Sequence, residues 1–168
     1  FTGGPDTARH VVRNSAENFA VTTLELGGKS PILVFDDADI EGAANGLIAG
    51  NFGASGQSCV AGTRGLVQRS ILAPLAARIA AKMADIRVGD PMAADTHVGP
   101  LATAAQIDTI TTTLNTARAQ GARIRHGGQR LDRPGHYMAP TLVEAHDPTT
   151  ETLKVEMFGP VMTLLPFD

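Results

Sequence analysis

The chain has 168 residues, of which 43% are hydrophobic and 18% charged, and its formal net charge is −3. These values fit one soluble globular core, and no run of roughly 20 apolar residues suits a membrane-spanning helix. The chain has 14 basic against 17 acidic residues, no Trp, one Tyr and six Phe. It therefore offers neither a positive field nor a stacking platform for nucleic acid, and we expect no nucleic acid and no membrane among its partners.

The ends of the chain and its single cysteine also carry information. Cys59 is the only cysteine, which excludes an internal disulfide and a multi-thiolate zinc site and fits a reducing cytoplasm. The chain begins at Phe1 without an initiator Met or a cleavable leader, and it stops at Asp168 directly after a strand-like run. We therefore expect a fragment that is incomplete at both ends.

The first elements of the chain show a change of hydrophobic period. A Pro-Asp pair suits the first turn of a helix, which is expected over residues 5–16. Residues 21–26 have the β-branched content of a strand. A continuous apolar run over residues 31–35 is typical of a strand that is buried on both faces, and such strands usually lie in an α/β sheet.

Helices and strands alternate in the remainder of the chain. Asp39 is suited to cap a helix that ends near residues 53–56 and carries apolar residues at helical spacing: Ile40, Ala43, Ala44, Leu47 and Ile48. The later pattern predicts helices over 70–83 and 102–120, and strands over 65–68, 122–125, 140–143 and 161–165. We therefore expect an α/β fold, an open sheet with helices on both faces.

Cys59 lies in a glycine-rich segment, residues 52–64. A lone cysteine is more often a small buried side chain than a nucleophile. Here Gly53, Gly56 and Gly62 allow backbone amides to approach a ligand, and a loop gives the thiol the access that a nucleophile needs. This setting favours a catalytic role for Cys59, but it does not exclude that Cys59 is a small buried side chain.

Glu25 stands between two leucines at the end of an expected strand. The alternation of Leu24, Glu25 and Leu26 is compatible with a carboxylate that simply points into solvent. Because Gly27 and Gly28 follow and allow backbone to approach a ligand, Glu25 is also a candidate for a partly desolvated general base. From these residues alone, both interpretations stay open.

Two further sets of residues carry weaker signals. The segment 156–160, Glu-Met-Phe-Gly-Pro, is by itself compatible with a turn that precedes the last strand. The five histidines are scattered without metal-ligand spacing, so we expect surface residues and no metal site: His10, His97, His126, His136 and His146.

Taken together, these segments resemble the motifs of the aldehyde dehydrogenase superfamily in the right order. Residues 1–4 resemble its Phe-Thr-Gly-Ser turn, 24–31 its glutamate motif, 52–64 its cysteine motif and 156–160 its Glu-x-Phe-Gly-Pro motif. The intervals of 34 positions from Glu25 to Cys59 and 97 from Cys59 to Glu156 are also similar to those of the family. The resemblance covers essentially the whole chain.

The resemblance implies an oxidoreductase that converts an aldehyde to a carboxylic acid with NAD or NADP. Cys59 would attack the carbonyl, a hydride would pass to the nicotinamide, and Glu25 would activate the water that hydrolyses the resulting thioester. The N–H of Cys59 and an asparagine absent from this chain would hold the oxyanion. Glu25 also implies the hydrolytic branch, because the CoA-acylating branch usually replaces this glutamate.

The same resemblance implies contacts to the nicotinamide half of the cofactor. Glu156 would accept hydrogen bonds from the ribose hydroxyls, and Phe158 would pack beside the nicotinamide. Leu26 and Gly27 would offer backbone contacts to the ring and its amide.

The first glycines and two motif residues complete the implied site. Gly3 and Gly4 would lie near the pyrophosphate at a helix N-terminus. Gly4 stands where the family commonly has Ser, so only a backbone contact remains there. Gln57 and Arg64 also match the cysteine motif, and we interpret them as supports of the Cys59 loop.

The resemblance further implies how the chain is divided and what it belongs to. Residues 1–26 would be the tail of a dinucleotide-binding domain, and residues 27–168 a catalytic domain that is incomplete at its C-terminus. The parent enzyme would be a cytoplasmic homodimer or homotetramer. We expect the isolated chain to be inactive, because the cofactor domain is missing from it.

Two other classes of function compete with this interpretation. A cysteine-dependent esterase or hydrolase would also use a thiol and a carboxylate, although it has no reason to carry Glu156 and Phe158. A non-catalytic module of the same fold would have no reason to retain both Cys59 and Glu25.

Overall fold

The computed structural model describes residues 1–168 and contains one five-stranded sheet with the order β1-β2-β5-β4-β3. The strands are β1 (Pro31–Val34), β2 (Arg64–Gln68), β3 (Arg123–His126), β4 (Thr141–Glu144) and β5 (Val161–Phe167). The helices are α1 (Pro5–Ser15), α2 (Ile40–Phe52), α3 (Arg69–Met83), α4 (Ala104–Ala119) and α5 (Glu151–Lys154), with 3₁₀ turns at Ala16–Asn18 and Gly53–Gly56. Neighbouring strands run parallel except β3, which is antiparallel to β4. The predicted α/β class is confirmed.

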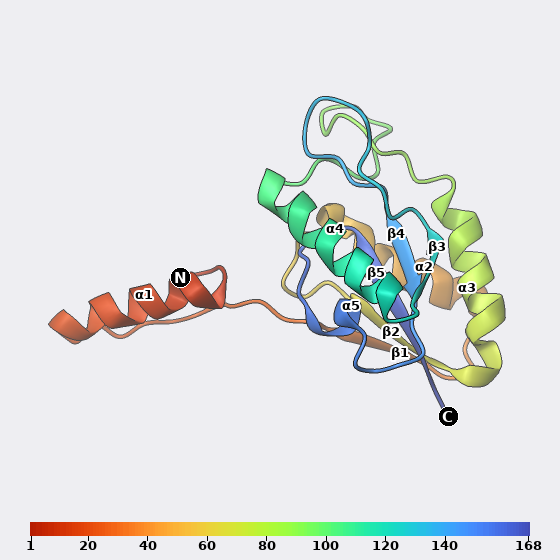
Figure 1. Cartoon of the computed structure of the whole chain (residues 1–168), viewed down its shortest axis with the longest axis horizontal. Helices are drawn as coiled ribbons and strands as arrows, with labels where there is room; N and C mark the ends of the chain where they lie inside the picture. The colour runs from red at the N-terminus through yellow and green to blue at the C-terminus, as the bar shows by residue number, and fades with distance from the viewer.

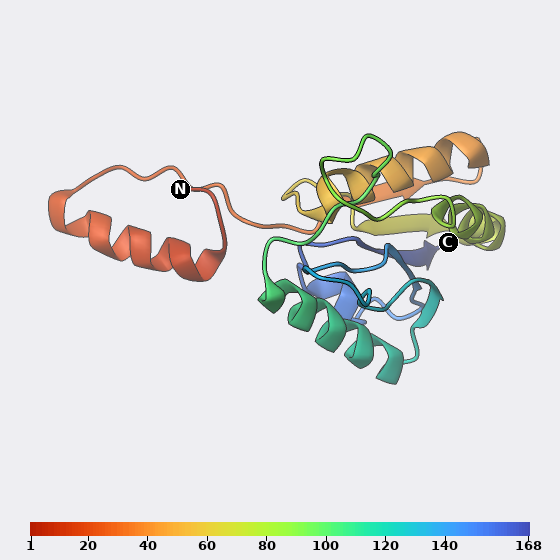
Figure 2. The ribbon, with the colours of Figure 1, turned by 90° about the horizontal axis from the view of Figure 1, so that it is seen from above.

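Helices cover both faces of the sheet, as predicted, and Figure 2 shows the layers from above. Successive side chains of a strand point to opposite faces. Leu142 of β4 and Met162 of β5 accordingly join one core cluster under α2 and α3, whereas Val143 and Val161 join a second cluster under α4. Both faces are therefore covered, which is why all of β4 and the first part of β5 are buried, including Glu144, which forms an ion pair with Arg125.

Side-chain caps fix the starts of two helices. The carboxylate of Asp39 accepts a hydrogen bond of 2.7 Å from the N–H of Gly42, as the predicted cap of α2 requires. Thr103 and Gln106 form a reciprocal capping box at the start of α4. Gly121 follows the end of α4 with a φ of 90°, a conformation that glycine adopts without steric cost.

Two strand predictions were wrong. Residues 21–26 form no strand, and only Glu25 makes an isolated bridge, to Thr2. Val21 is 97% exposed, because no other strand lies beside this segment. The strand predicted over 31–35 exists as β1, but it is the edge strand of the sheet and is not buried on both faces, since the side chain of Leu33 is 54% exposed.

The other predicted elements were found within a few residues of their predicted bounds. The only helix that the pattern missed is α5, whose four residues are too few to show a helical period. No helix of the chain is both long enough and apolar enough to cross a bilayer.

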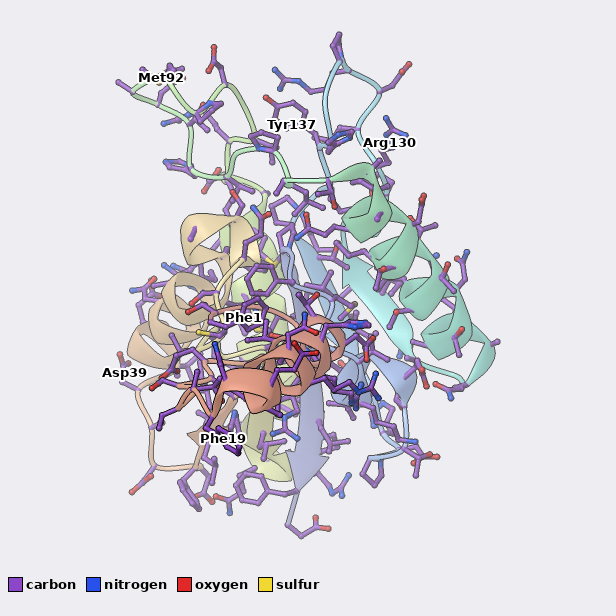
Figure 3. The ribbon with its side chains drawn as sticks, turned by 90° about the vertical axis from the view of Figure 1, so that its left-hand side faces the viewer. Phe1, Phe19, Asp39, Met92, Arg130 and Tyr137 are labelled. Atoms are coloured by element: carbon purple, nitrogen blue, oxygen red, sulfur yellow. The ribbon has the colours of Figure 1, made fainter.

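Most of the N-terminal segment, residues 1–30, projects from the layered sheet (Figure 1), and its last residues pack against the loops that enter β2 and β5. Figure 1 shows α1 projecting to one side, connected to β1 by an extended segment. Along α1 only Ala8 is buried. Figure 3 looks onto this segment, which carries Phe1 and Phe19, while the loops with Met92 and Tyr137 lie at a different end of the sheet.

Candidate functional site

The predicted site residues lie on loops that enter three neighbouring parallel strands. Glu25 to Gly27 come shortly before β1, Cys59 comes shortly before β2, and Glu156 and Phe158 come directly before β5. In the sheet, β2 pairs with both β1 and β5. Because all three strands run in the same direction, the loops that precede them lie together at the amino-terminal end of these strands.

These loops and the N-terminal turn line one open cavity of about 470 Å³. Its lining contains every predicted site residue together with three neighbours: Thr2, Gly3, Gly4, Glu25, Leu26, Gly27, Gln57, Ser58, Cys59, Glu156 and Phe158. Residues from four separate parts of the sequence thus share one site.

Backbone hydrogen bonds hold the N-terminal turn against the Glu25 segment. The N–H of Gly3 donates to the carbonyl of Glu25 at 3.0 Å, and the N–H of Glu25 donates to the carbonyl of Phe1 at 2.9 Å. Gly4 is the N-cap of α1, and it provides no side-chain cap. The free N–H groups and the positive end of the helix dipole therefore face the same region as Gly3, an arrangement that favours a bound anion.

Cys59 presents its thiol to the cavity. The residue is exposed, so it is not the small buried side chain that a lone cysteine most often is. Its N–H makes no hydrogen bond within the chain and is free to bind a ligand. An accessible thiol beside a free N–H is a combination that suits a nucleophile.

Two of the three glycines around Cys59 serve packing, and none of the three opens the backbone to the cavity as we predicted. None of Gly53, Gly56 and Gly62 lines the cavity. A Cβ on Gly56, whose φ is 71°, would come within 2.3 Å of the carbonyl oxygen of Gly159, and one on Gly62 would come within 2.3 Å of Ile32. Gly56 and Gly62 thus let the Cys59 loop lie against the two neighbouring segments.

Glu25 reaches the same cavity as Cys59, although the residue is exposed. Both sequence interpretations of Glu25 are therefore met in part: the side chain is solvated, and it borders the site. Within this chain Glu25 is exposed, so it lacks the partial desolvation that was part of the general-base interpretation. Close packing nevertheless holds the two segments together, since a Cβ on Gly28 would touch the carbonyl oxygen of Cys59 at 3.5 Å.

Glu156 packs directly against the backbone of the Glu25 segment. A Cβ on Gly27 would lie 1.7 Å from Oε2 of Glu156, so a larger residue at this position requires the carboxylate of Glu156 to move. The other carboxylate oxygen, Oε1, is buried without a hydrogen-bond partner. A buried acceptor without a donor is costly, and a ligand that supplies hydroxyl groups would satisfy it. Phe158, two residues further on, has a φ of 49°, which is uncommon for a residue with a side chain.

Two basic residues, Lys29 and Arg64, lie where the loops that enter β1 and β2 meet. Arg64, the first residue of β2, donates a hydrogen bond from Nη2 to the carbonyl of Lys29, which connects the start of β2 to the segment before β1. Lys29 is half-buried. Burial and the neighbouring charge of Arg64 lower the pKa of Lys29 to about 8, although the carboxylate of Glu156 acts in the opposite direction.

This lowered pKa predicts a pH-dependent stability. Between about pH 8 and the ordinary lysine value of 10.5, the unfolded chain binds more protons than the folded one, so the cost of burying the Lys29 charge disappears as the pH rises. We expect Lys29→Met to raise the thermal midpoint most below pH 8, with a gain that shrinks up to pH 10.5. Melting curves of the unmodified protein and of Lys29→Met across this pH range measure the difference in thermal midpoint. Lys154→Met, at an exposed lysine, is the control, and a gain from Lys29→Met that stays constant with pH would contradict the prediction.

No group of three or more His, Cys, Asp and Glu side chains is placed to hold a metal ion. Three of the histidines are exposed, as predicted, but His126 and His136 are half-buried. Nδ1 of His136 is buried without a hydrogen-bond partner.

Two side chains of the site's surroundings were not singled out from the sequence. Lys29 lies in the glutamate motif, but nothing in its spacing predicts that the fold buries it beside Arg64. Gln106 donates to the carbonyl of Phe158 at 3.1 Å. The capping-box pattern that begins at Thr103 was the signal that could have drawn attention to Gln106.

The fold and the cavity together define an α/β domain with an accessible thiol beside two carboxylates. The profile of the aldehyde dehydrogenase family matches residues 1–168, so this chain belongs to the aldehyde dehydrogenase family. The predicted family resemblance is confirmed.

Individual relatives agree with this assignment. The chain is 45% identical over 165 residues to (Z)-2-((N-methylformamido)methylene)-5-hydroxybutyrolactone dehydrogenase of Acinetobacter baylyi, covering 98% of this chain and 34% of the relative. A betaine aldehyde dehydrogenase of Staphylococcus aureus solved with NAD⁺ is 37% identical, with a TM-score of 0.94 over 100% of this chain and 34% of that one. For an aldehyde dehydrogenase of Bacillus cereus, also an NAD⁺ complex, the identity is 34% and the TM-score 0.94, over 100% and 34% of the two chains. The chain thus spans about a third of the length of these relatives.

Proposed function

We propose that this chain is the catalytic core of an NAD(P)-dependent aldehyde dehydrogenase of the hydrolytic branch, which oxidises an aldehyde to a carboxylic acid. One observation carries the proposal: Cys59, Glu25 and Glu156, far apart in the sequence, line the same cavity. An esterase needs the first two residues only. The presence of Glu156 and Phe158 in that cavity therefore favours the dehydrogenase.

The residues present fit the nicotinamide half of NAD(P). Glu156 has a buried oxygen that lacks a donor, which suits the hydroxyl groups of a ribose. Leu26 and Gly27 contribute N–H groups that make no hydrogen bond within the chain, and Phe158 gives an aromatic surface. The α1 N-terminus at Gly4 suits a phosphate group. When it is bound, NAD(P) accepts the hydride that leaves the substrate carbon.

The side chains of this chain supply the remaining chemistry. The thiolate of Cys59 adds to the aldehyde carbon, and the free N–H of Cys59 donates to the oxygen that gains negative charge. After oxidation the acyl group is a thioester on Cys59. Glu25 then accepts a proton from a water molecule, which attacks the thioester, so that the carboxylic acid leaves and the thiolate is restored.

We also propose that residues 1–26 are the tail of a dinucleotide-binding domain and residues 27–168 the catalytic domain. The projection of α1 away from the sheet supports this division (Figure 1). A segment with one buried residue, Ala8, has little core of its own. Limited proteolysis of the full-length enzyme that carries this chain tests the boundary. A protease cuts an exposed junction between domains before it cuts the folded domains, so the first cleavage is expected near residues 26–27.

The parent enzyme is further proposed to be a cytoplasmic homodimer or homotetramer. Leu33 of the edge strand β1 and Phe35, which follows the strand, are half-exposed and support association, because exposed apolar side chains at an unpaired edge strand are usually covered. The single exposed thiol fits a reducing compartment. Sedimentation analysis of the full-length enzyme tests the oligomeric state.

The proposed function is tested by incubating the full-length enzyme with aldehydes, with and without NAD or NADP. We expect aldehyde-dependent formation of NADH or NADPH and of the carboxylic acid. Ester hydrolysis without any nucleotide-dependent oxidation would favour the cysteine hydrolase, and no turnover of either kind would favour the non-catalytic module.

A single methyl group at Gly27 should weaken cofactor binding. In Gly27→Ala the new Cβ would occupy the place of Oε2 of Glu156, so the carboxylate has to move. We expect KM for NAD(P) to rise about tenfold or more, since a hydrogen bond to a charged group contributes about 1.5–3 kcal/mol. Gly46→Ala, where an added Cβ meets no atom within 4 Å, is the matched control. Equal KM values for the two variants would contradict the assigned position of Glu156.

A further inference from the structure

Two glutamine side chains meet between the Cys59 loop and the start of α4. Gln106 donates from Nε2 to Oε1 of Gln57 at 3.4 Å and to the carbonyl of Phe158 at 3.1 Å. Gln57 lies two residues before Cys59, and Phe158 follows Glu156. One amide group therefore binds both the loop that carries the thiol and the loop that carries the proposed cofactor contacts.

Backbone donors fix the orientation of both amides. The N–H of Thr103 donates to Oε1 of Gln106 at 2.9 Å, so the NH₂ group of Gln106 has to face the other two loops. The N–H of Ala102 donates to Oε1 of Gln57 at 2.9 Å, and Nε2 of Gln57 donates to the carbonyl of Pro100 at 3.3 Å. Each of the two hydrogens of the Gln106 amide thus has one acceptor.

The acceptor on the second loop belongs to a residue in an uncommon conformation. Phe158 has a φ of 49°, and a residue with a side chain stays in this region only where surrounding contacts determine its conformation. The hydrogen bond from Gln106 to its carbonyl is such a contact. The close approach of Gly56 to the carbonyl of Gly159 joins the same two loops a second time.

We propose that Gln106 is a positioning residue, which holds the Cys59 loop and the Phe158 loop at a fixed separation through its one amide group. The proposal rests on the proposed function, in which the thiol and the nicotinamide ring have to meet the same substrate carbon. Gln106 itself does not line the cavity. Its effect is therefore expected on the reactivity of Cys59 and on cofactor affinity together.

The test uses Gln106→Glu in the full-length enzyme, which keeps the acceptor for Thr103 and replaces the donor by a carboxylate oxygen that repels Gln57 and Phe158. The rate of Cys59 alkylation by iodoacetamide and the Kd for NADH or NADPH are measured by mass spectrometry and by nucleotide fluorescence. We expect the alkylation rate and the Kd each to change by about three- to tenfold, which corresponds to the free energy that one hydrogen bond contributes. Gln106→Met, which removes the donor without adding charge, should change both in the same direction and serves if the glutamate variant does not fold.

Two controls separate this role from helix capping. Gln129→Glu makes the same chemical change at an exposed residue whose side chain makes no hydrogen bond, and it should leave both values unchanged. Thr103→Ala weakens the capping box and should lower the thermal midpoint without changing either value.

The outcomes distinguish the two proposals. If the Gln106 variants only lower the thermal midpoint, as Thr103→Ala does, or change only one of the two values, Gln106 is a helix cap and the inference is wrong. Neither measurement requires turnover, so both remain informative even if the unmodified enzyme oxidises no aldehyde, a result that would overturn the proposed function instead.

Discussion

Replacing Cys59 by alanine should abolish aldehyde oxidation by the full-length enzyme. The alanine side chain cannot form the covalent adduct, so we expect kcat to fall by at least about 10⁴-fold, as removal of a catalytic nucleophile does in other enzymes. Stopped-flow measurement should show no burst of NADH or NADPH. Because Cys59 is exposed, its replacement leaves no cavity in the core, and the thermal midpoint should stay close to that of the unmodified enzyme.

Cofactor binding provides the control for this variant. We expect Cys59→Ala to bind NAD or NADP with unchanged affinity, because the proposed cofactor contacts lie on Glu156, Phe158 and the Glu25 segment. Oxidation at the unmodified rate would show that the thiol is not the nucleophile, and it would revive the non-catalytic interpretation of Cys59.

Replacing Glu25 by glutamine should slow the release of the acid more than the oxidation step. The amide cannot accept a proton from water, and loss of a general base costs about 10²–10⁴-fold. We therefore expect steady-state turnover to fall by that factor, while the first turnover still gives a burst of NADH or NADPH. Acid quenching during turnover should trap the acyl group on Cys59.

Glu17→Gln is the matched control for Glu25→Gln, because it makes the same change at an exposed residue of the same N-terminal segment. We expect it to retain full turnover. If Glu25→Gln shows no burst although the thioester can be trapped, another group is the base, and the assignment of Glu25 is wrong.

The local elements of this fold could be predicted because their signals are local. Asp39 caps α2 through a contact three residues away, and the apolar positions of α2 repeat at helical spacing. Residues 21–26 misled the same reasoning, since β-branched residues satisfy a strand pattern whether or not another strand lies beside them. The position of β1 at the sheet edge likewise depends on its neighbours, which a single segment does not reveal.

The residues of the site could be predicted from the sequence, but the contacts that hold them together could not. The family motifs pointed to Cys59, Glu25 and Glu156, and all three line one cavity. The roles of these residues remain predictions, which the experiments above address. No local pattern indicated that Gly56 and Gly62 pack against neighbouring segments, or that Gln106 binds two loops, because these contacts join residues distant along the chain.

The amino-acid sequence alone determined an ordinary globular composition, a single cysteine, most helices and strands, and the motifs that indicate the aldehyde dehydrogenase family. The tertiary structure decided the order β1-β2-β5, and with it the meeting of three entering loops at the amino-terminal end of these strands. Strand order arises from packing between segments more than thirty positions apart, to which no local pattern corresponds. That packing is what turns a lone cysteine and two distant carboxylates into the lining of one cavity.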